Sequence, residues 1–266
     1  MGGDRRPVKP NPFDSQLAVD NSGLHWATAS GLTAAPTNTR SDPFLFEAHT
    51  AFRNLVLAPG FSCVGAKAAL NENAYGLATY PRLASAETTA GLCHDLCEFA
   101  HSHLVERTEY ATFIAVFREP AGIDEAGFEQ LLWQQLQGLH QADRVHFGWD
   151  HSVSPDPDDP EFSFSFAGRA FYVIGMHPGS SRTARTFKWP AMVFNAHEQF
   201  ERLRTEGKWK RMQRSIRARE MVLQGSINPM LSDFGQQSEA RQYSGRAVPN
   251  DWKPPGGSGG KCPFGH

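Results

Sequence analysis

The stretch from residue 162 to residue 204 constrains the fold more than any other part of the sequence. Residues 162–166 are FSFSF, the period-2 pattern of a strand with one buried face. Gly168 interrupts the apolar run and residues 170–174 resume it, which predicts a second strand or a bulged continuation of the first. The centre of the fold is therefore predicted to be a buried sheet.

A polar loop and a helix are predicted after these strands. The loop, residues 177–182, is HPGSSR, which is rich in turn-forming residues. Asn195 is followed three residues later by Glu198, a capping-box pattern, so we expect a helix that begins there, carries His197 and extends to about Arg219. A sheet edge, a basic loop and a histidine at a helix start together favour a site for an anionic cofactor.

The remaining elements are predicted from the spacing of apolar residues. Helical spacing indicates helices over residues 44–57, 85–105 and 124–142, and a short run rich in Phe, Ile and Val indicates a strand over 111–117. Helices and strands do not alternate regularly enough for a parallel βαβ series. We therefore expect one mixed α+β domain, with a small central sheet flanked by helices.

Composition sets the expected limits of that domain. Residues 1–42 are rich in Pro, Asn, Thr, Ser and Gly, which predicts a loosely ordered N-terminal arm. The folded domain is expected over residues 43–250. Residues 251–266 are predicted to form a flexible C-terminal tail, because residues 254–260 have the composition of a linker.

Charge and hydropathy narrow the class of protein. The chain has 26 Lys and Arg against 28 Asp and Glu, and a net charge of −2 gives no indication of nucleic-acid binding. The sequence has no apolar run of the roughly 18 residues that span a bilayer, and no apolar signal core at its N-terminus. Four cysteines in 266 residues do not resemble a disulfide framework. We expect a cytoplasmic protein with reduced thiols and no membrane partner.

Cys63 is the strongest candidate for chemistry. It precedes a predicted helix of small residues, so its sulfur should face free backbone N–H groups and the positive end of the helix dipole. Both influences lower a thiol pKa and stabilise the thiolate. Gly65 has no side chain and lets a flat ligand approach the backbone. Haem-thiolate enzymes hold their iron with such a cysteine, although a free cysteine is more often simply a buried residue.

Two histidines and two arginines are further candidates. His177 and His197 lie beside predicted elements, and a histidine at a helix start favours a neutral imidazole, which is able to bind a metal or to accept a hydrogen bond. Arg182 and Arg185 suit the recognition of carboxylates, such as haem propionates or an amino-acid substrate. The alternatives are packing histidines and a solvated surface loop.

The other cysteines offer weaker possibilities. Cys93 and Cys97 share a helix face with His101, and His94 is nearby, so a zinc site is conceivable, although buried core thiols are the simpler interpretation. Cys262 precedes a proline, a pair sometimes associated with haem ligation, and follows the glycine-rich tail.

Several long motifs resemble the YqcI/YcgG family, and within it the haem-dependent N-hydroxylases of the guanitoxin-biosynthesis type. The motifs are FSCVGAKAALN at 61–71, DPDDPEFSFSFAGRAFYVIGMHPGSSRTAR at 156–185, FNAHEQFERLR at 194–204, QGSINPMLSDFG at 224–235, EARQYSGRAV at 239–248 and the terminal CPFGH. The resemblance extends from about residue 44 to the end of the chain.

The resemblance implies a b-type haem, dioxygen as co-substrate, and hydroxylation of a guanidino or amino nitrogen on an amino-acid-like small molecule. Residues 43–250 then form the haem-binding catalytic domain, and a redox partner is an expected source of electrons. Because a thiolate ligand favours O–O cleavage, Cys63 becomes the expected axial ligand, followed by His197 and then Cys262. The acidic segment 156–161 and the aromatic strands are expected to bind a guanidinium.

Two other classes of protein stay open: a haem-binding sensor or carrier without turnover, and a zinc-binding protein. The sequence names neither the substrate nor the electron donor.

Overall fold

The computed structural model describes residues 10–38, 42–230, 232–256 and 263–264. The helices are α1 (Gln16–Asn21), α2 (Pro43–Leu57), α3 (Val64–Asn71), α4 (Ala86–Ala100), α5 (His103–Arg107), α6 (Glu125–Asp143), α7 (His197–Thr205) and α8 (Trp209–Gln224), with short 3-10 turns η1 (Thr183–Arg185) and η2 (Glu239–Gln242). The strands are β1 (His25–Thr28), β2 (Gly31–Ala34), β3 (Tyr75–Arg82), β4 (Thr112–Glu119), β5 (Phe164–Phe166), β6 (Arg169–Met176) and β7 (Ala191–Ala196).

The strands form one seven-stranded mixed sheet in the order β2-β1-β3-β4-β7-β6-β5. β3 and β4 are parallel and are connected through α4 and α5, whereas the other neighbours pair antiparallel. The prediction of a mixed α+β domain with a central sheet flanked by helices is confirmed.

The central strands bury side chains on both faces of the sheet. In β4, Phe113, Ala115 and Phe117 belong to one core, while Ile114 and Val116 belong to the other. β7 alternates in the same way. This alternation follows from the period of two in a strand, and it explains why both strands are almost continuously apolar.

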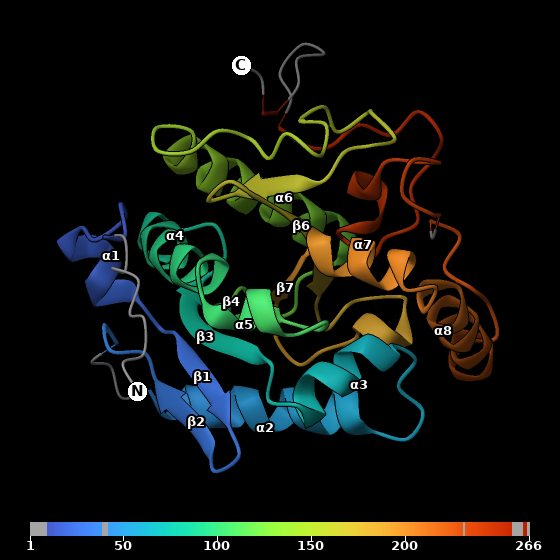
Figure 1. Cartoon of the computed structure of the whole chain (residues 1–266), viewed down its shortest axis with the longest axis horizontal. Helices are drawn as coiled ribbons and strands as arrows, with labels where there is room; N and C mark the ends of the chain where they lie inside the picture. Colours follow the sequence, from blue (N-terminus) through green and yellow to red (C-terminus); the bar gives the residue numbers. More distant parts are fainter. Residues whose placement is uncertain (1–9, 39–41, 231, 257–262, 265–266) are drawn as a thin grey trace.

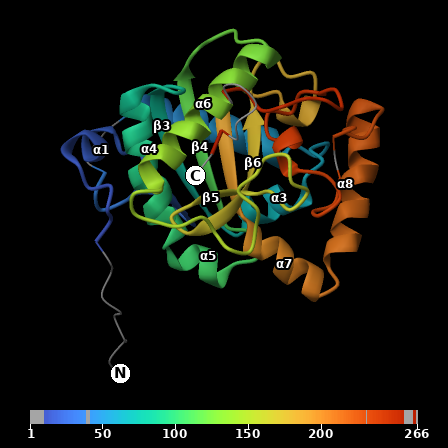
Figure 2. The same ribbon diagram turned by 90° about the horizontal axis from the view of Figure 1, so that it is seen from above.

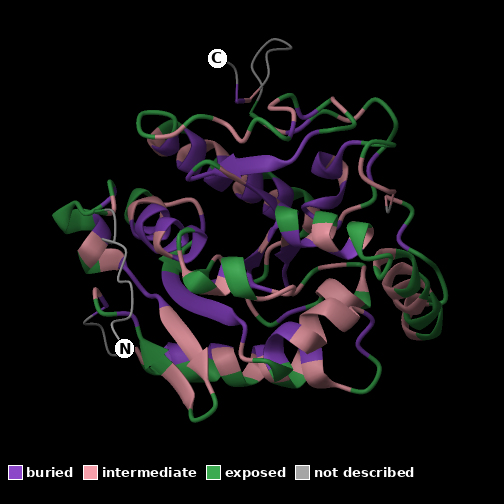
Figure 3. Ribbon diagram, viewed as in Figure 1, coloured by how far each residue is buried: buried purple, intermediate pink, exposed green. Residues whose placement is uncertain are grey.

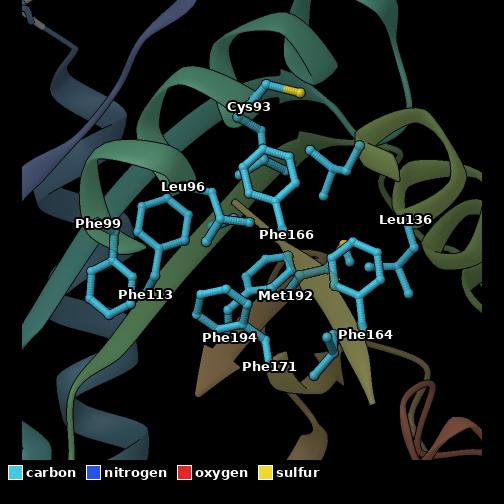
Figure 4. Packing of buried hydrophobic residues seen from close by; sticks show 14 of the residues in the cluster. Cys93, Leu96, Phe99, Phe113, Leu136, Phe164, Phe166, Phe171, Met192 and Phe194 are labelled. Carbon is cyan, nitrogen blue, oxygen red and sulfur yellow. The ribbon is translucent and has the colours of Figure 1, made fainter. Parts of the chain in front are cut away.

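Helices cover the two faces and give the molecule three layers (Figure 1). α4 and α6 pack on one face, where phenylalanines of β4, β5, β6 and β7 fill a dense core together with Leu96, Leu136 and Met192 (Figure 4). α2 and α3 pack on the other face. α1 and α8 lie at opposite ends of the molecule in both ribbon views (Figures 1 and 2).

The N-terminal segment is more ordered than its composition predicts, so the expectation of a loose arm over residues 1–42 needs correction for residues 10–38. α1 packs against α4, and β1 and β2 form a hairpin that extends the sheet beside β3. Phe13 is inserted into the core, where its ring stacks on Phe166 at 5.4 Å. These contacts are long-range, and composition carries no signal for them. Residues 1–9 and 39–41 are outside the described part.

The C-terminal segment also has a buried anchor. Phe264 is fully buried, with its ring within 5.9 Å of the rings of Trp133 and Phe162. Burial of a phenylalanine contributes about 1.5–3 kcal/mol, which is enough to hold a short segment against the domain. The prediction of a flexible tail over 251–266 is therefore corrected at Phe264, while residues 257–262 are outside the described part.

Two predicted helices differ from the observed ones. The predicted helix over 85–105 is divided at His101 into α4 and α5, and the helix expected to extend to Arg219 is divided at Gly207, whose φ is 70°, into α7 and α8. Asn195 is not an N-cap. It pairs with Thr112 and Tyr172 inside β7, so strand pairing continues to the residue before α7 and overrides the capping-box pattern.

None of the described helices has the length and apolar character needed to cross a membrane.

Asp143, at the end of α6, is a buried carboxyl group that supports the β5–β6 hairpin. Its Oδ1 accepts a hydrogen bond of 2.8 Å from the N–H of Ala167, a turn residue with φ of 53°. Burial raises the pKa of Asp143 to about 7, although this hydrogen bond acts in the opposite direction. The folded state therefore favours the protonated carboxyl over the ionised one.

This raised pKa predicts a pH-dependent effect of Asp143→Asn. Between the ordinary pKa near 4 and the folded pKa near 7, the folded protein binds more protons than the unfolded one, so stability decreases as pH rises. A neutral amide at this position carries no such cost. The free energy of unfolding of the variant, relative to the original protein, should therefore increase between pH 5 and pH 8, by about 3 kcal/mol.

Denaturant unfolding at both pH values measures this difference. Asp143→Ala, which loses the hydrogen bond to Ala167 as well as the charge, should be less stable than Asp143→Asn at both. A difference between Asp143→Asn and the original protein that does not change with pH would show that the carboxyl is ionised normally.

Candidate functional site

A cavity of about 240 Å³ lies on the α2–α3 side of the sheet, against β6 and β7. α3, α7, α8 and η2 form its remaining walls. Most of the lining is apolar or aromatic, with Tyr110, Tyr172, Phe200, Trp209 and Phe234 among the lining residues. The cavity is therefore a concave, mainly apolar site with a few polar groups, which is the usual character of a small-molecule site.

α8 is an unusual wall because none of its residues is buried (Figure 3). Met212 and Ile216 line the cavity, whereas Lys210, Arg211 and Arg214 are exposed to solvent. An ion pair of 3.3 Å between Arg182 and Glu220 connects the helix to the loop after β6. Because α8 has no buried residue of its own, its position depends on contacts such as this pair and the hydrogen bonds of Gln224 with Ser181 and Thr183.

Cys63 lies where the sequence predicts, at the N-cap of α3, and it lines the cavity. Its Sγ accepts a hydrogen bond of 3.4 Å from the N–H of Ala66. Burial nevertheless raises the pKa of Cys63, and this effect exceeds the lowering by the N–H groups of Ala66 and Gly65. The expected low thiol pKa is therefore corrected. The thiol is protonated without a metal, and a bound metal ion would displace the proton.

Gly65 also lines the cavity. A Cβ added there would lie 3.7 Å from Tyr110 and 3.9 Å from Met212, which are ordinary contact distances. Packing therefore does not require a glycine at this position. A side chain there would instead narrow the space between α3 and α8.

His197 occupies the first position of α7 and lines the cavity opposite α3. Burial lowers its pKa, so the ring is neutral. Its Nε2 has no hydrogen-bond partner and lies 3.6 Å from Oε1 of Glu239, which is too long for a hydrogen bond. Glu239 itself is buried, and burial raises its pKa to about 8.

The two arginines of the loop after β6 both line the cavity, but both already make hydrogen bonds within the protein. Arg182 pairs with Glu220 and donates to the carbonyl of Ser226 at 3.0 Å. Arg185 donates to the carbonyls of Gly175 and Tyr243. Arg182 therefore secures α8, and Arg185 fixes the inner wall.

His177 does not join this group. It is fully buried, stacks on Phe128 at 4.4 Å, and is absent from the lining of the cavity. Its place at the end of β6 directs it toward α6, on the other side of the sheet from Cys63. Cys262 is outside the described residues.

Of the candidate zinc residues, Cys93, Cys97 and His94 are core residues, whereas His101 is exposed. Cys93 and Cys97 are buried, and burial raises the pKa of both thiols, that of Cys97 to about 12. His94 Nδ1 lies 3.0 Å from Asp95 Oδ1. Among the described residues, no group of three or more Cys, His, Asp or Glu side chains is placed to hold a metal ion. The zinc interpretation has no support in this geometry.

Glu239, Tyr172 and Trp209 line the cavity, and the sequence assigned a role to none of them. Glu239 begins the segment EARQYSGRAV, so the motif was visible although its contribution was not. The acidic segment 156–161, expected to bind a cation, does not line the cavity. The carboxyl groups that do so come from α8, η2 and the loop before β4.

The chemistry of the lining fits a haem. A thiol and an imidazole without a hydrogen bond at Nε2, both of them groups that can ligate iron in haem proteins, line a cavity with apolar and aromatic walls and arginines at its side. The volume is slightly below the roughly 300 Å³ at which small-molecule sites usually begin. A macrocycle would therefore need a wider cavity, and α8 is the wall without buried residues.

The YqcI/YcgG family model matches residues 52–264. The chain belongs to the YqcI/YcgG family. The matched region contains every wall of the cavity, whereas α1, β1 and β2 precede it. No curated protein and no solved structure shows significant similarity to the chain.

The ion pair between Arg182 and Glu220 predicts how α8 is held. Both side chains are largely buried, with 11% and 14% of their area exposed, so the loss of one partner leaves the other unpaired and should cost more than a surface pair, about 1–3 kcal/mol. Arg182→Ala should therefore increase amide hydrogen exchange in α8 and leave α2 unchanged.

Glu220→Gln is the matched variant. Because both changes break the same ion pair, the increase in exchange in α8 of the double variant should be smaller than the sum of the increases in the two single variants. Additive effects, or unchanged exchange in α8, would show that the pair does not hold the helix.

Proposed function

We propose that this protein binds haem b in the cavity between α3 and α8. We further propose that it uses dioxygen to hydroxylate a guanidino or amino nitrogen of an amino-acid-like small molecule. The observation that carries the proposal is that Cys63 and His197, from separate elements, line the same mainly apolar cavity. The family membership and the likeness of its long motifs to haem-dependent N-hydroxylases add to it.

Cys63 is the proposed axial ligand. The start of α3 presents the N–H of Ala66 to its sulfur, and such a hydrogen bond tunes the electron donation of a thiolate. Gly65 leaves the adjacent backbone open to a flat ring. Arg182 is the proposed partner of a propionate, and it would exchange Glu220 for that carboxylate when α8 moves.

The proposed reaction has a simple balance. One oxygen atom of dioxygen enters an N–H bond of the substrate, and the other leaves as water with two protons and two electrons from an external donor. The bound haem supplies the iron at which dioxygen is reduced. The protein orients the substrate nitrogen, and the aromatic lining excludes water from the reacting atoms.

A haem-binding sensor or carrier is the second candidate. The observation in its favour is that the ring of His197 also lines the cavity, with a free Nε2. An iron held by both Cys63 and His197 would have no open position for dioxygen. Spectral shifts on addition of guanidino compounds favour the enzyme, whereas a six-coordinate iron indifferent to them favours the sensor.

The absorption spectrum of the reduced, CO-bound protein tests the ligand. The original protein should show the strongly red-shifted Soret band of a thiolate complex, and Cys63→Ser should abolish it. Cys97→Ser, which changes a buried thiol away from the cavity, is the matched control and should retain the band.

Two results would redirect the proposal. A shifted band that persists in Cys63→Ser and disappears in Cys262→Ser identifies the terminal cysteine as the ligand. A spectrum of the original protein like that of a histidine-ligated globin excludes both cysteines and leaves His197. A purified protein that retains no haem after supplementation contradicts the proposed function.

A further inference from the structure

Glu239 is a buried carboxyl group at the edge of the cavity, where it begins η2. Only 5% of its area is exposed, and it lines the cavity. Its Oε2 accepts hydrogen bonds from Ser163 Oγ at 3.1 Å and from the Tyr243 hydroxyl at 3.3 Å. Its Oε1 instead faces His197 Nε2. One oxygen is thus bound by the protein, while the other is available at the cavity.

The charges around the cavity single out this carboxyl. Among the described residues, three carboxyl groups line the cavity. Glu220 pairs with Arg182 at 3.3 Å, and Glu109 pairs with Lys208 at 2.7 Å. The neighbour of Glu239 is instead the neutral ring of His197. Among the described residues no Lys or Arg makes an ion pair with Glu239, so a cation that enters the cavity would supply a partner and favour the ionised carboxylate.

The cations of the protein nearest to this end are engaged elsewhere. Arg204 lies over the rings of Trp209 and Phe234 and pairs with Glu201. Arg185 is bound to backbone carbonyls. Neither donates a hydrogen bond to Glu239, although the positive charge of Arg204 lowers its pKa from a distance, so among the described residues its Oε1 has no cationic hydrogen-bond donor.

The surrounding groups match a flat or compact organic cation. Oε1 of Glu239 and Nε2 of His197 are 3.6 Å apart, and in the tautomer with its proton on Nδ1 the imidazole adds a second acceptor beside the carboxylate. Two adjacent acceptors suit the paired N–H donors of a guanidinium or the several donors of an ammonium. The rings of Tyr172 and Phe200 line the same cavity and add aromatic groups that can interact with a cation.

We infer that Glu239 and His197 form a subsite that binds the cationic nitrogen group of a small ligand, a guanidinium or a primary ammonium, and selects against neutral groups of the same shape. The inference deepens the proposed function and rests on it for the placement of the reacting nitrogen in this cavity. In this arrangement His197 contacts the small ligand, and Cys63 holds the iron.

Isothermal titration calorimetry with two pairs of probes tests the subsite. Methylguanidine and methylurea have the same shape, but only the first is a cation, and L-arginine and L-citrulline form the corresponding amino-acid pair. The original protein, supplemented with haem, should bind each cation more tightly than its neutral partner. Glu239→Gln should lower the affinity for the two cations by about 10- to 100-fold and leave the affinity for the neutral probes nearly unchanged.

A purely structural role for Glu239 predicts a different pattern. In Glu239→Gln the side-chain amide carbonyl would still accept from Ser163 and Tyr243, so the variant should be as stable as the original protein while its selectivity is lost. Glu198→Gln, on the exposed side of α7, makes the same change in net charge and should retain the selectivity. Glu239→Asp keeps the charge and should keep the preference for the cation.

The outcomes separate this inference from the proposed function. Equal binding of methylguanidine and methylurea to the original protein, or an unchanged preference in Glu239→Gln, overturns the subsite even where haem is bound. Selective binding that depends on Glu239 in a protein that retains no haem supports the subsite and contradicts the oxygenase.

Discussion

The burial of β4 and β7 on both faces is the constraint on which the structure depends. One face is closed by α4 and α6, and aromatic side chains make up much of the core there. The other face is closed by α2 and α3 only over part of the sheet. Beside α3, the side chains of Tyr172, Ile174 and Val193 face a cavity instead of a helix core. The site is therefore a cavity on the α2–α3 face of the sheet, between β6 and β7 on one side and α8 on the other.

Burial favours the uncharged forms of three ionisable groups at the cavity. Burial raises the pKa of both Cys63 and Glu239 and lowers that of His197, so the thiol, carboxyl and imidazole all favour their uncharged forms. A metal ion would displace the proton of the thiol, and an organic cation would favour the carboxylate. The same low polarity that suppresses these charges would strengthen their interactions with a ligand of opposite sign.

The sequence predicted the elements well wherever the pattern was local. The helix start at Cys63 and the position of His197 at the beginning of α7 agree with the structure. The strand signal at residues 162–166 agrees only in part, because β5 covers Phe164–Phe166 alone and Ser163 and Ser165 are buried as well, so the strand has no exposed face. The N-cap role of Asn195 was wrong because pairing with β6 is a long-range interaction that a capping pattern cannot reveal. For the same reason, the hairpin of β1 and β2 was missed.

The candidate site was predicted in part. Cys63, Gly65, Arg182, Arg185 and His197 lie together at the cavity, but His177 is directed to the opposite side of the sheet. Whether a thiol pKa falls at a helix start or rises through burial depends on the depth of the site, which the local sequence does not contain. Glu239 could not be found because its significance lies in its pairing: among the described residues no Lys or Arg makes an ion pair with it, and only the folded chain shows this.

The most direct test of the proposed haem site is a crystal structure of the haem-supplemented protein with the iron located by anomalous scattering. We expect the iron to be bonded to Sγ of Cys63, between α3 and α8, with α8 displaced outward from its position against the cavity. An iron bonded to His197 alone, or located away from this cavity, would contradict the proposed site.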